Sequence, residues 1–232
     1  MSSRIGILGG MTAESTVTYY QHIVRRYQQR CGDHAYPEIV IYSVSFQRFK
    51  DWMDADDWAS IEVELGSGLR RLAAAGADFA VMATNTMHLL FQRLQQDSPI
   101  PLISIVEATA DAIDRAGLHT VGLLGTRFTM EKGFYVEGLA RRGIRALVPE
   151  KTERDLVHEV IMAELARGIL DDRSRARYLA VIDGLARAGA EGIVLGCTEI
   201  PLLVRPDDSP IPLFDTAVLH AEAALARAMA HP

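Results

Sequence analysis

Short apolar runs alternate along the chain with longer segments whose apolar residues recur every three or four positions. The apolar runs predict strands at residues 4–9, 38–44, 79–83, 102–105, 120–124, 144–148, 191–195 and 211–214. The longer segments predict helices at residues 13–30, 58–75, 88–96, 106–116, 129–142, 153–167, 172–188 and 216–230. Strands that alternate with helices are typical of a parallel sheet with helices on both faces, so the pattern predicts an α/β fold.

Small and polar residues mark the places where the predicted strands end. The first strand closes on Gly9-Gly10, and Thr12 can cap the helix that follows it. The second strand is followed by Gln47, Arg48 and Lys50, where we expect a polar loop.

Two stretches, residues 76–90 and 189–203, follow the same order of residue types. Each begins with Gly-Ala and an acidic residue, continues as an apolar strand, and ends in polar residues that can start a helix. Thr84 and Cys197 stand at the same place in the two stretches, 113 residues apart (197 − 84). Two further pairs of segments match in the same order: 5–9 with 121–125, and 100–103 with 211–214. Matches that keep their order indicate two halves of one design.

The duplication predicts two pseudo-symmetric domains, each a short parallel sheet flanked by helices. We place the N-terminal domain at residues 1–106 plus 209–232 and the C-terminal domain at residues 107–208. In open α/β sheets, ligands bind beyond the carboxyl ends of the strands. We therefore expect an active site in the cleft where the strand ends of the two domains face each other.

Charge and cysteine content narrow the possible partners. The 232 residues carry a formal net charge of −6, which argues against a nucleic-acid partner. Two cysteines, Cys31 and Cys197, form no disulfide framework and are compatible with a reducing cytoplasm. No uncharged apolar segment reaches the roughly 18 residues that a membrane helix needs, so no membrane partner is expected.

Four loops at predicted strand ends are candidates for chemistry: Gly9–Thr12, Thr84–His88, Gly125–Thr129 and Cys197–Glu199. Backbone N–H groups and the positive end of a following helix attract an anion such as a carboxylate. The same placement is expected to lower the pKa of Cys197 and to favour its thiolate.

Simpler structural explanations exist for several of these residues. An isolated cysteine is often inert filler, and Cys31 fits that explanation because it only ends a helix. Taken alone, Thr84 can be a helix cap, and His88 a structural partner one turn into a helix.

Other known site patterns are absent. Gly6, Gly9 and Gly10 lack the spacing of a dinucleotide-binding loop. His158-Glu159 lacks the second histidine of a zinc motif, so no metal site is expected. The chain also has no G-x-S-x-G motif of a serine hydrolase.

Four segments together resemble the aspartate/glutamate racemases over nearly the whole chain. Residues 193–201 (Ile-Val-Leu-Gly-Cys-Thr-Glu-Ile-Pro) resemble the second signature of that family, and residues 83–88 (Ala-Thr-Asn-Thr-Met-His) resemble the first, C-N-T-x-H. The opening of the chain, residues 6–16, and a mid-chain loop, residues 124–130, are similar as well. The resemblance implies racemisation of an amino acid without a cofactor, in a cleft between two pseudo-symmetric domains, usually in a homodimer.

The chain departs from the family at one catalytic position, where Thr84 replaces the usual first cysteine. In the family, one cysteine removes the α-proton and the other returns a proton on the opposite face. The resemblance thus implies that Cys197 is the base for the L-enantiomer and that Thr84 is the opposite proton donor. A threonine hydroxyl is a poor base, so we expect inversion mainly from L to D.

The resemblance implies roles for further residues. Four match positions that hold the substrate carboxylate and amine: Met11, Asn85, Thr86 and Thr198. Thr126 is a contact in the second half, and Glu199 orients or helps to deprotonate Cys197. Gln47, with Arg48, is a candidate for side-chain recognition. The substrate would be an amino acid such as glutamate or aspartate, although Ala166 stands where members that act on aspartate carry a lysine.

Two alternatives stay open at the level of sequence. The same scaffold and cysteine serve maleate isomerases, arylmalonate decarboxylases and hydantoin racemases. A non-catalytic amino-acid-binding module that lost its first cysteine is a second alternative, and it would bind amino acids without exchanging their α-protons.

Overall fold

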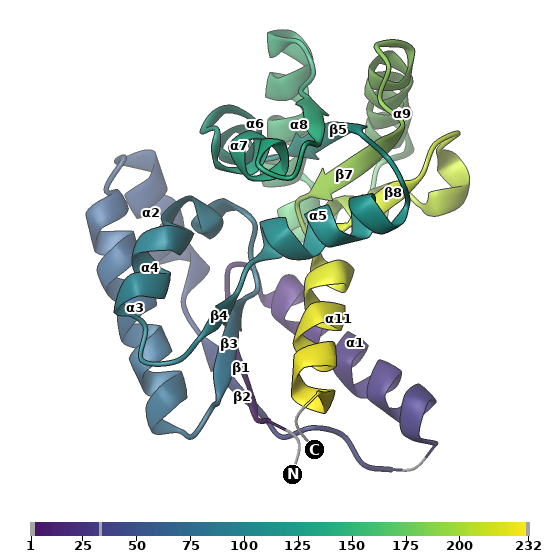
Figure 1. Ribbon diagram of the computed structural model, residues 1–232. Helices are drawn as coiled ribbons and strands as arrows, with labels where there is room; N and C mark the ends of the chain where they lie inside the picture. The colour runs from purple at the N-terminus through teal and green to yellow at the C-terminus, as the bar shows by residue number, and fades with distance from the viewer. Residues whose placement is uncertain (1–2, 33, 231–232) are drawn as a thin grey trace. The chain divides into compact units, whose positions relative to one another are not determined.

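The computed structural model describes residues 3–32 and 34–230. The chain forms two compact units, one of residues up to Ser104 together with those from His220 onward, and one of Ile105–Leu219. We call them unit 1 and unit 2. Each unit holds one parallel four-stranded sheet flanked by helices, so the predicted α/β fold is confirmed (Figure 1).

The sheet of unit 1 has the strand order β2-β1-β3-β4. Its strands are β1 (Ile5–Gly9), β2 (Ile39–Ser43), β3 (Phe79–Met82) and β4 (Leu102–Ile103). All three pairings are parallel, and Leu8 of the central strand β1 is in register with Tyr42 and Met82. Every residue of β1 and β3 is buried, as expected of strands covered on both faces.

Helices cover both faces of this sheet. Those of unit 1 are α1 (Ala13–Cys31), α2 (Phe46–Asp54), α3 (Trp58–Ala74), the 3₁₀ helix η1 (Thr86–Leu90), α4 (Phe91–Asp97) and most of α11 (Thr216–Met229). In Figure 1, α1 and α11 lie on one face, and α2, α3 and α4 lie on the other. Leu8, Phe49, Leu65, Leu69 and Met82 pack together beneath the second group. Burial of each such side chain contributes roughly 1.5–3 kcal/mol.

The loop expected around Gln47 is wrong, because these residues form α2. Phe46, Phe49 and Met53 recur every three or four positions and pack toward α3 and the sheet, with Phe49 fully buried. The polar residues between these three side chains made the segment resemble a loop in the sequence pattern. The apolar face stabilises a helix that begins immediately after β2.

Unit 2 repeats the topology of unit 1, with the strand order β6-β5-β7-β8. Its strands are β5 (Thr120–Gly125), β6 (Arg145–Leu147), β7 (Gly192–Gly196) and β8 (Leu213–Asp215). Successive strand residues face opposite sides, so Leu123 packs toward α5 and α7, and Leu124 toward α8 and α9. In both sheets the first strand of the unit is central and pairs with the second and third.

The helices of unit 2 include short pieces that the sequence pattern did not predict. In full, the helices of unit 2 are α5 (Ile105–Arg115), α6 (Arg127–Glu131), α7 (Phe134–Ala140), α8 (Lys151–Ala163), η2 (Leu165–Arg167), α9 (Asp172–Arg187), α10 (Ile200–Leu203) and η3 (Pro206–Asp208). The single helix expected at 129–142 is two helices, α6 and α7. Gly133 separates them with φ +78°, a left-handed conformation that interrupts a right-handed helix.

The unit boundaries differ from those expected. Residues 209–219 belong to unit 2, because β8 hydrogen-bonds to β7 through the pairs Ile193–Leu213 and Val194–Phe214. The chain rejoins unit 1 only at His220, within α11. At the other end, unit 2 begins at Ile105, two residues before the expected residue 107.

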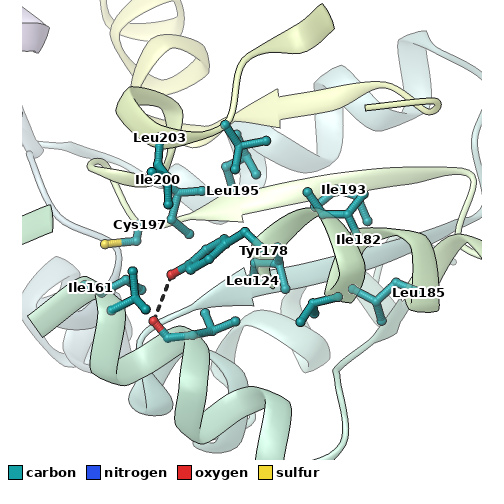
Figure 2. Packing of buried hydrophobic residues seen from close by; sticks show 14 of the residues in the cluster. Leu124, Ile161, Tyr178, Ile182, Leu185, Ile193, Leu195, Cys197, Ile200 and Leu203 are labelled. Atoms are coloured by element: carbon teal, nitrogen blue, oxygen red, sulfur yellow. Dashed lines mark hydrogen bonds between the residues drawn. The ribbon is translucent and has the colours of Figure 1, made fainter. Parts of the chain in front are cut away.

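The largest cluster of unit 2 packs α8, α9 and α10 against β5 and β7 (Figure 2). Tyr178 lies fully buried within it, and its hydroxyl donates to the carbonyl of Val157 at 2.8 Å. Leu195 and Ile200, on either side of Cys197 in sequence, belong to the same cluster. The cluster therefore fixes the backbone on both sides of the cysteine.

Candidate active site

The carboxyl ends of β1 and β3 lie side by side in unit 1, and the first signature, residues 83–88, follows β3. The Ala83 N–H donates to the Leu8 carbonyl at 2.9 Å, which continues the ladder past the end of β3. The Ser15 hydroxyl donates to the Ala83 carbonyl at 2.8 Å, and the Thr16 hydroxyl accepts from the Gly10 N–H at 2.8 Å. Hydroxyls from the first turn of α1 thus fix both strand ends.

This edge of the sheet brings together four residues expected at the site: Met11, Thr84, Asn85 and Thr86. All four are buried, three of them with polar side chains. Burying a polar side chain costs free energy unless a hydrogen bond compensates it. Buried polar residues at a strand end therefore indicate a binding site more strongly than exposed polar residues do. The arrangement suits recognition of a small polar molecule.

Gln47 lies elsewhere, on the exposed surface of α2. Its amide donates to Asp51 Oδ1 at 2.7 Å, one helical turn away. The neighbouring Arg48 pairs with Glu64 at 2.8 Å. Both side chains are engaged with helix neighbours, and their expected part in side-chain recognition stays a prediction.

The carboxyl ends of β5 and β7 carry the corresponding residues of unit 2. Thr126 follows β5 and caps α6, where its hydroxyl accepts from the Thr129 N–H. Cys197 follows β7 directly, and its thiol donates to Glu199 Oε2 at 3.0 Å. The Thr198 hydroxyl donates to the same oxygen at 2.8 Å. The Glu199 carboxylate is thus an acceptor shared by two site residues.

Cys197 lies at the margin of the hydrophobic cluster and is 7% exposed. Figure 2 shows its sulfur directed away from the ring of Tyr178 and from the packed side chains behind it. The sulfur is therefore held by packing on one side, while its proton is engaged by Glu199.

The expectation of a lowered pKa for Cys197 is wrong. Burial first, and then the charge of the Glu199 carboxylate, raise the pKa of this thiol well above its usual range. Backbone N–H groups of Thr198 and Glu199 favour the thiolate but do not outweigh those effects. The resting residue is a neutral thiol with a proton acceptor in contact.

A second acidic side chain of unit 2, one that lies near Tyr178, was not anticipated from the sequence. Glu164, at the end of α8, accepts from the Ser174 hydroxyl at 3.0 Å. Burial first, and then Cys197 and Glu164, raise the pKa of the Tyr178 hydroxyl well above its usual range. No local sequence pattern marks Glu164 or Tyr178. They lie far from Cys197 in sequence, and only the packing of α8, α9 and β7 brings these elements together.

The structural explanation expected for His88 is confirmed, whereas the one expected for Cys31 is wrong. His88 is buried, and its ring hydrogen-bonds to the Thr84 carbonyl, so it is a structural partner as expected. Cys31 is exposed at the end of α1, so it fills no core.

Over residues 3–32 and 34–230, no group of three or more histidine, cysteine or acidic side chains is arranged to hold a metal ion. Nor does any helix in that part of the chain have the length and apolar character required to cross a membrane.

The chain matches known proteins along nearly its whole length. The broad specificity amino-acid racemase RacX of Bacillus subtilis is 25% identical, over 98% of this chain and 99% of its own. A Yersinia pestis crystal structure assigned to the Asp/Glu racemases shares 38% identity with a TM-score of 0.91, over 98% of this chain and 99% of that one. An aspartate racemase homologue from Pyrococcus horikoshii shares 33% identity with a TM-score of 0.85, over 99% and 100%. A family model described as Asp/Glu/hydantoin racemase matches residues 8–224, and the chain therefore belongs to that family, as its two signatures predicted.

Proposed function

We propose that the protein is a cofactor-independent racemase that inverts the α-carbon of an amino acid such as glutamate or aspartate. The observation that carries the proposal is the 3.0 Å hydrogen bond from the Cys197 thiol to Glu199, at the carboxyl end of a buried strand. Family membership and the amino-acid racemase named in Bacillus subtilis support the same class of reaction.

The Cys197–Glu199 pair supplies the base. Glu199 takes the thiol proton, and the resulting thiolate removes the α-proton of the L-enantiomer, which ends on sulfur. Because its pKa is raised, the thiolate binds a proton more strongly than an exposed thiolate does. That strength is useful here, since the α-proton of an amino acid is very weakly acidic.

Thr84 supplies the proton on the opposite face of the α-carbon. Its hydroxyl donates to the carbanion and is reprotonated from water, while Glu199 releases its proton to solvent. One proton therefore enters from solvent and one leaves in each inversion. The hydroxyl does not sit ionised at neutral pH, so it removes the α-proton of the D-enantiomer slowly, and α-proton exchange is faster from the L-enantiomer, on the Cys197 face.

Polar groups at the strand ends stabilise the charge that develops on the substrate. Asn85, Thr86 and Thr198 hold the α-carboxylate and amine by hydrogen bonds, and donors fixed before the reaction need no rearrangement as charge develops. Met11 and Thr126 complete the contacts. With these groups the scheme needs no pyridoxal phosphate as an electron sink.

The test is incubation with single L- and D-amino acids in heavy water, with α-deuteration read by NMR. We expect deuterium to enter faster from the L-enantiomer, with a D-product appearing. Cys197→Ala should lose α-proton exchange, because the base is removed.

Cys31→Ser is the matched control for that experiment, because it removes the other thiol of the chain at an exposed position. It should keep the wild-type exchange rate. Exchange retained in Cys197→Ala would rule out the thiol mechanism, and equal rates from both enantiomers would rule out the asymmetry.

A further inference from the structure

The backbone around Thr84 is held by side chains rather than by regular structure. β3 ends at Met82, and η1 begins at Thr86. In an α-helix the His88 N–H would bond to the carbonyl four residues earlier, that of Thr84. Here it bonds instead to the Asn85 carbonyl at 3.0 Å, in 3₁₀ fashion. The Thr84 carbonyl accepts from the His88 ring, whose Nδ1 lies 2.8 Å away.

The His88 ring is itself fixed on two sides. It stacks on Phe91 with ring centroids 5.3 Å apart and an interplanar angle of 7°. It meets the ring of His220 edge-on at 5.6 Å. His220 is fully buried and bonds to the Ile103 carbonyl and the Tyr19 hydroxyl, both at 2.8 Å. The ring cannot turn without breaking this packing.

The proton positions follow from the partners. A carbonyl oxygen only accepts, so Nδ1 of His88 carries the proton that is donated to Thr84. For the same reason Nε2 of His220 donates to Ile103, and its Nδ1 accepts from the Tyr19 hydroxyl. Both rings are neutral at neutral pH, since burial lowers the pKa of His88 to about 3 and that of His220 to about 4.

We propose that His88 is a positioning residue, which aims the Thr84 hydroxyl by holding the carbonyl of the same residue. The inference rests on the proposed racemase function, in which Thr84 returns the proton. The Thr84 carbonyl and side chain share one Cα, so a shift of the peptide redirects the hydroxyl. A misplacement of about 1 Å lowers a rate on the order of a hundredfold.

Two variants of His88 separate the hydrogen bond from the packing. His88→Asn keeps an N–H donor close to the place of Nδ1. His88→Leu fills the place of the ring with an apolar side chain and removes the donor. Phe91→Leu is the matched packing control, since it removes the stacking partner and leaves the donor.

The measurement is the amount of D-product formed per α-deuteron incorporated from the L-enantiomer. Exchange on the Cys197 face does not need Thr84, whereas inversion does. We expect His88→Leu to lower this ratio at least tenfold, on the scale of such misplacements, and His88→Asn and Phe91→Leu to stay within about threefold of wild type. An unchanged ratio in His88→Leu, or equal losses of exchange and inversion, would overturn the proposal.

A second readout does not depend on activity. The methyl resonance of Thr84, assigned with a Thr84→Ser variant, should shift further in His88→Leu than in His88→Asn, because both lose the His88 ring and only His88→Leu also loses the donor. If wild-type protein exchanged no amino acid, the proposed function would fail while this resonance still decided the positioning. Equal shifts in the two variants would refute it.

Discussion

At the scale of single residues, Cys197 illustrates how burial and charge decide chemistry. Its place after a strand favours a thiolate, because backbone N–H groups point at the sulfur. Burial and the Glu199 carboxylate act in the opposite sense and outweigh them. The pair can still generate a base, because the acceptor for the thiol proton is already in contact at 3.0 Å.

Glu199→Gln should lower the pKa of Cys197, because it removes the negative charge next to the thiol. The pKa should remain above its usual value of about 8.5, since burial is the larger cause and persists. The ultraviolet absorbance of the thiolate, followed against pH in a Cys31→Ser background, measures this. The matched blank is the same background with Cys197→Ala, and a pKa that rises in Glu199→Gln would contradict the assignment.

Thr84→Cys should raise α-proton exchange from the D-enantiomer on the order of a hundredfold, because a thiol replaces a hydroxyl that cannot act as a base. Thr84→Ser keeps a hydroxyl and should keep the faster α-proton exchange from the L-enantiomer. Both are measured by deuteration of each enantiomer separately. No gain with D-substrate in Thr84→Cys would show that Thr84 does not act on the substrate.

At the scale of elements, the turn from β1 into α1 has the tightest backbone requirements in unit 1. Gly10 has φ +87°, and a Cβ there would collide with the backbone carbonyl of Val44. The Val44 N–H in turn donates to the Gly9 carbonyl at 3.0 Å. The turn must pass this close to the chain leaving β2, so only glycine fits.

Gly10→Ala should lower the free energy of unfolding by about 2 to 4 kcal/mol, from backbone strain and collision together. Gly32→Ala is the control, because Gly32 has a similar φ of +72° and open space around it. Its cost should be about 1 kcal/mol. Both tryptophans, Trp52 and Trp58, lie in unit 1, so fluorescence during denaturation reports on this unit. Equal costs would contradict the collision.

At the scale of the whole molecule, the chain returns to unit 1 through His220. This residue, near the start of α11, contacts Tyr19 of α1, His88 of η1 and Ile103 of β4. Residues some 200 positions apart, Tyr19 and His220, therefore share one buried network. The network makes unit 1 depend on both ends of the chain.

Unit 1 should lose stability in acid because of these neutral histidines. The folded pKa of His88 is about 3 against about 6.5 when unfolded, so below pH 6.5 the unfolded state binds the extra proton. The stabilisation is complete above that pH and falls as the pH drops toward 3. Between about pH 5.5 and 4, wild type should lose about 1.4 kcal/mol per pH unit relative to His88→Asn, by tryptophan fluorescence. Parallel pH profiles would contradict it.

The sequence by itself determined which segments form the strands, in their order along the chain, and the equivalence of Thr84 and Cys197. Both follow from local patterns: apolar runs, glycines at turns, and two copies of one motif at strand ends. Helix α2 was missed, because the apolar face of Phe46, Phe49 and Met53 gains its stability only against α3 and the sheet. Likewise Gly133 divides a pattern that reads as one helix.

Only the tertiary structure decided the charge state of Cys197, the contact of His88 with the Thr84 carbonyl, and the placement of β8 in unit 2. These depend on which groups meet after packing and on how much water is excluded around them. Hydrophobic periodicity records which face of an element is buried, but not its partner, and a pKa depends on the partner.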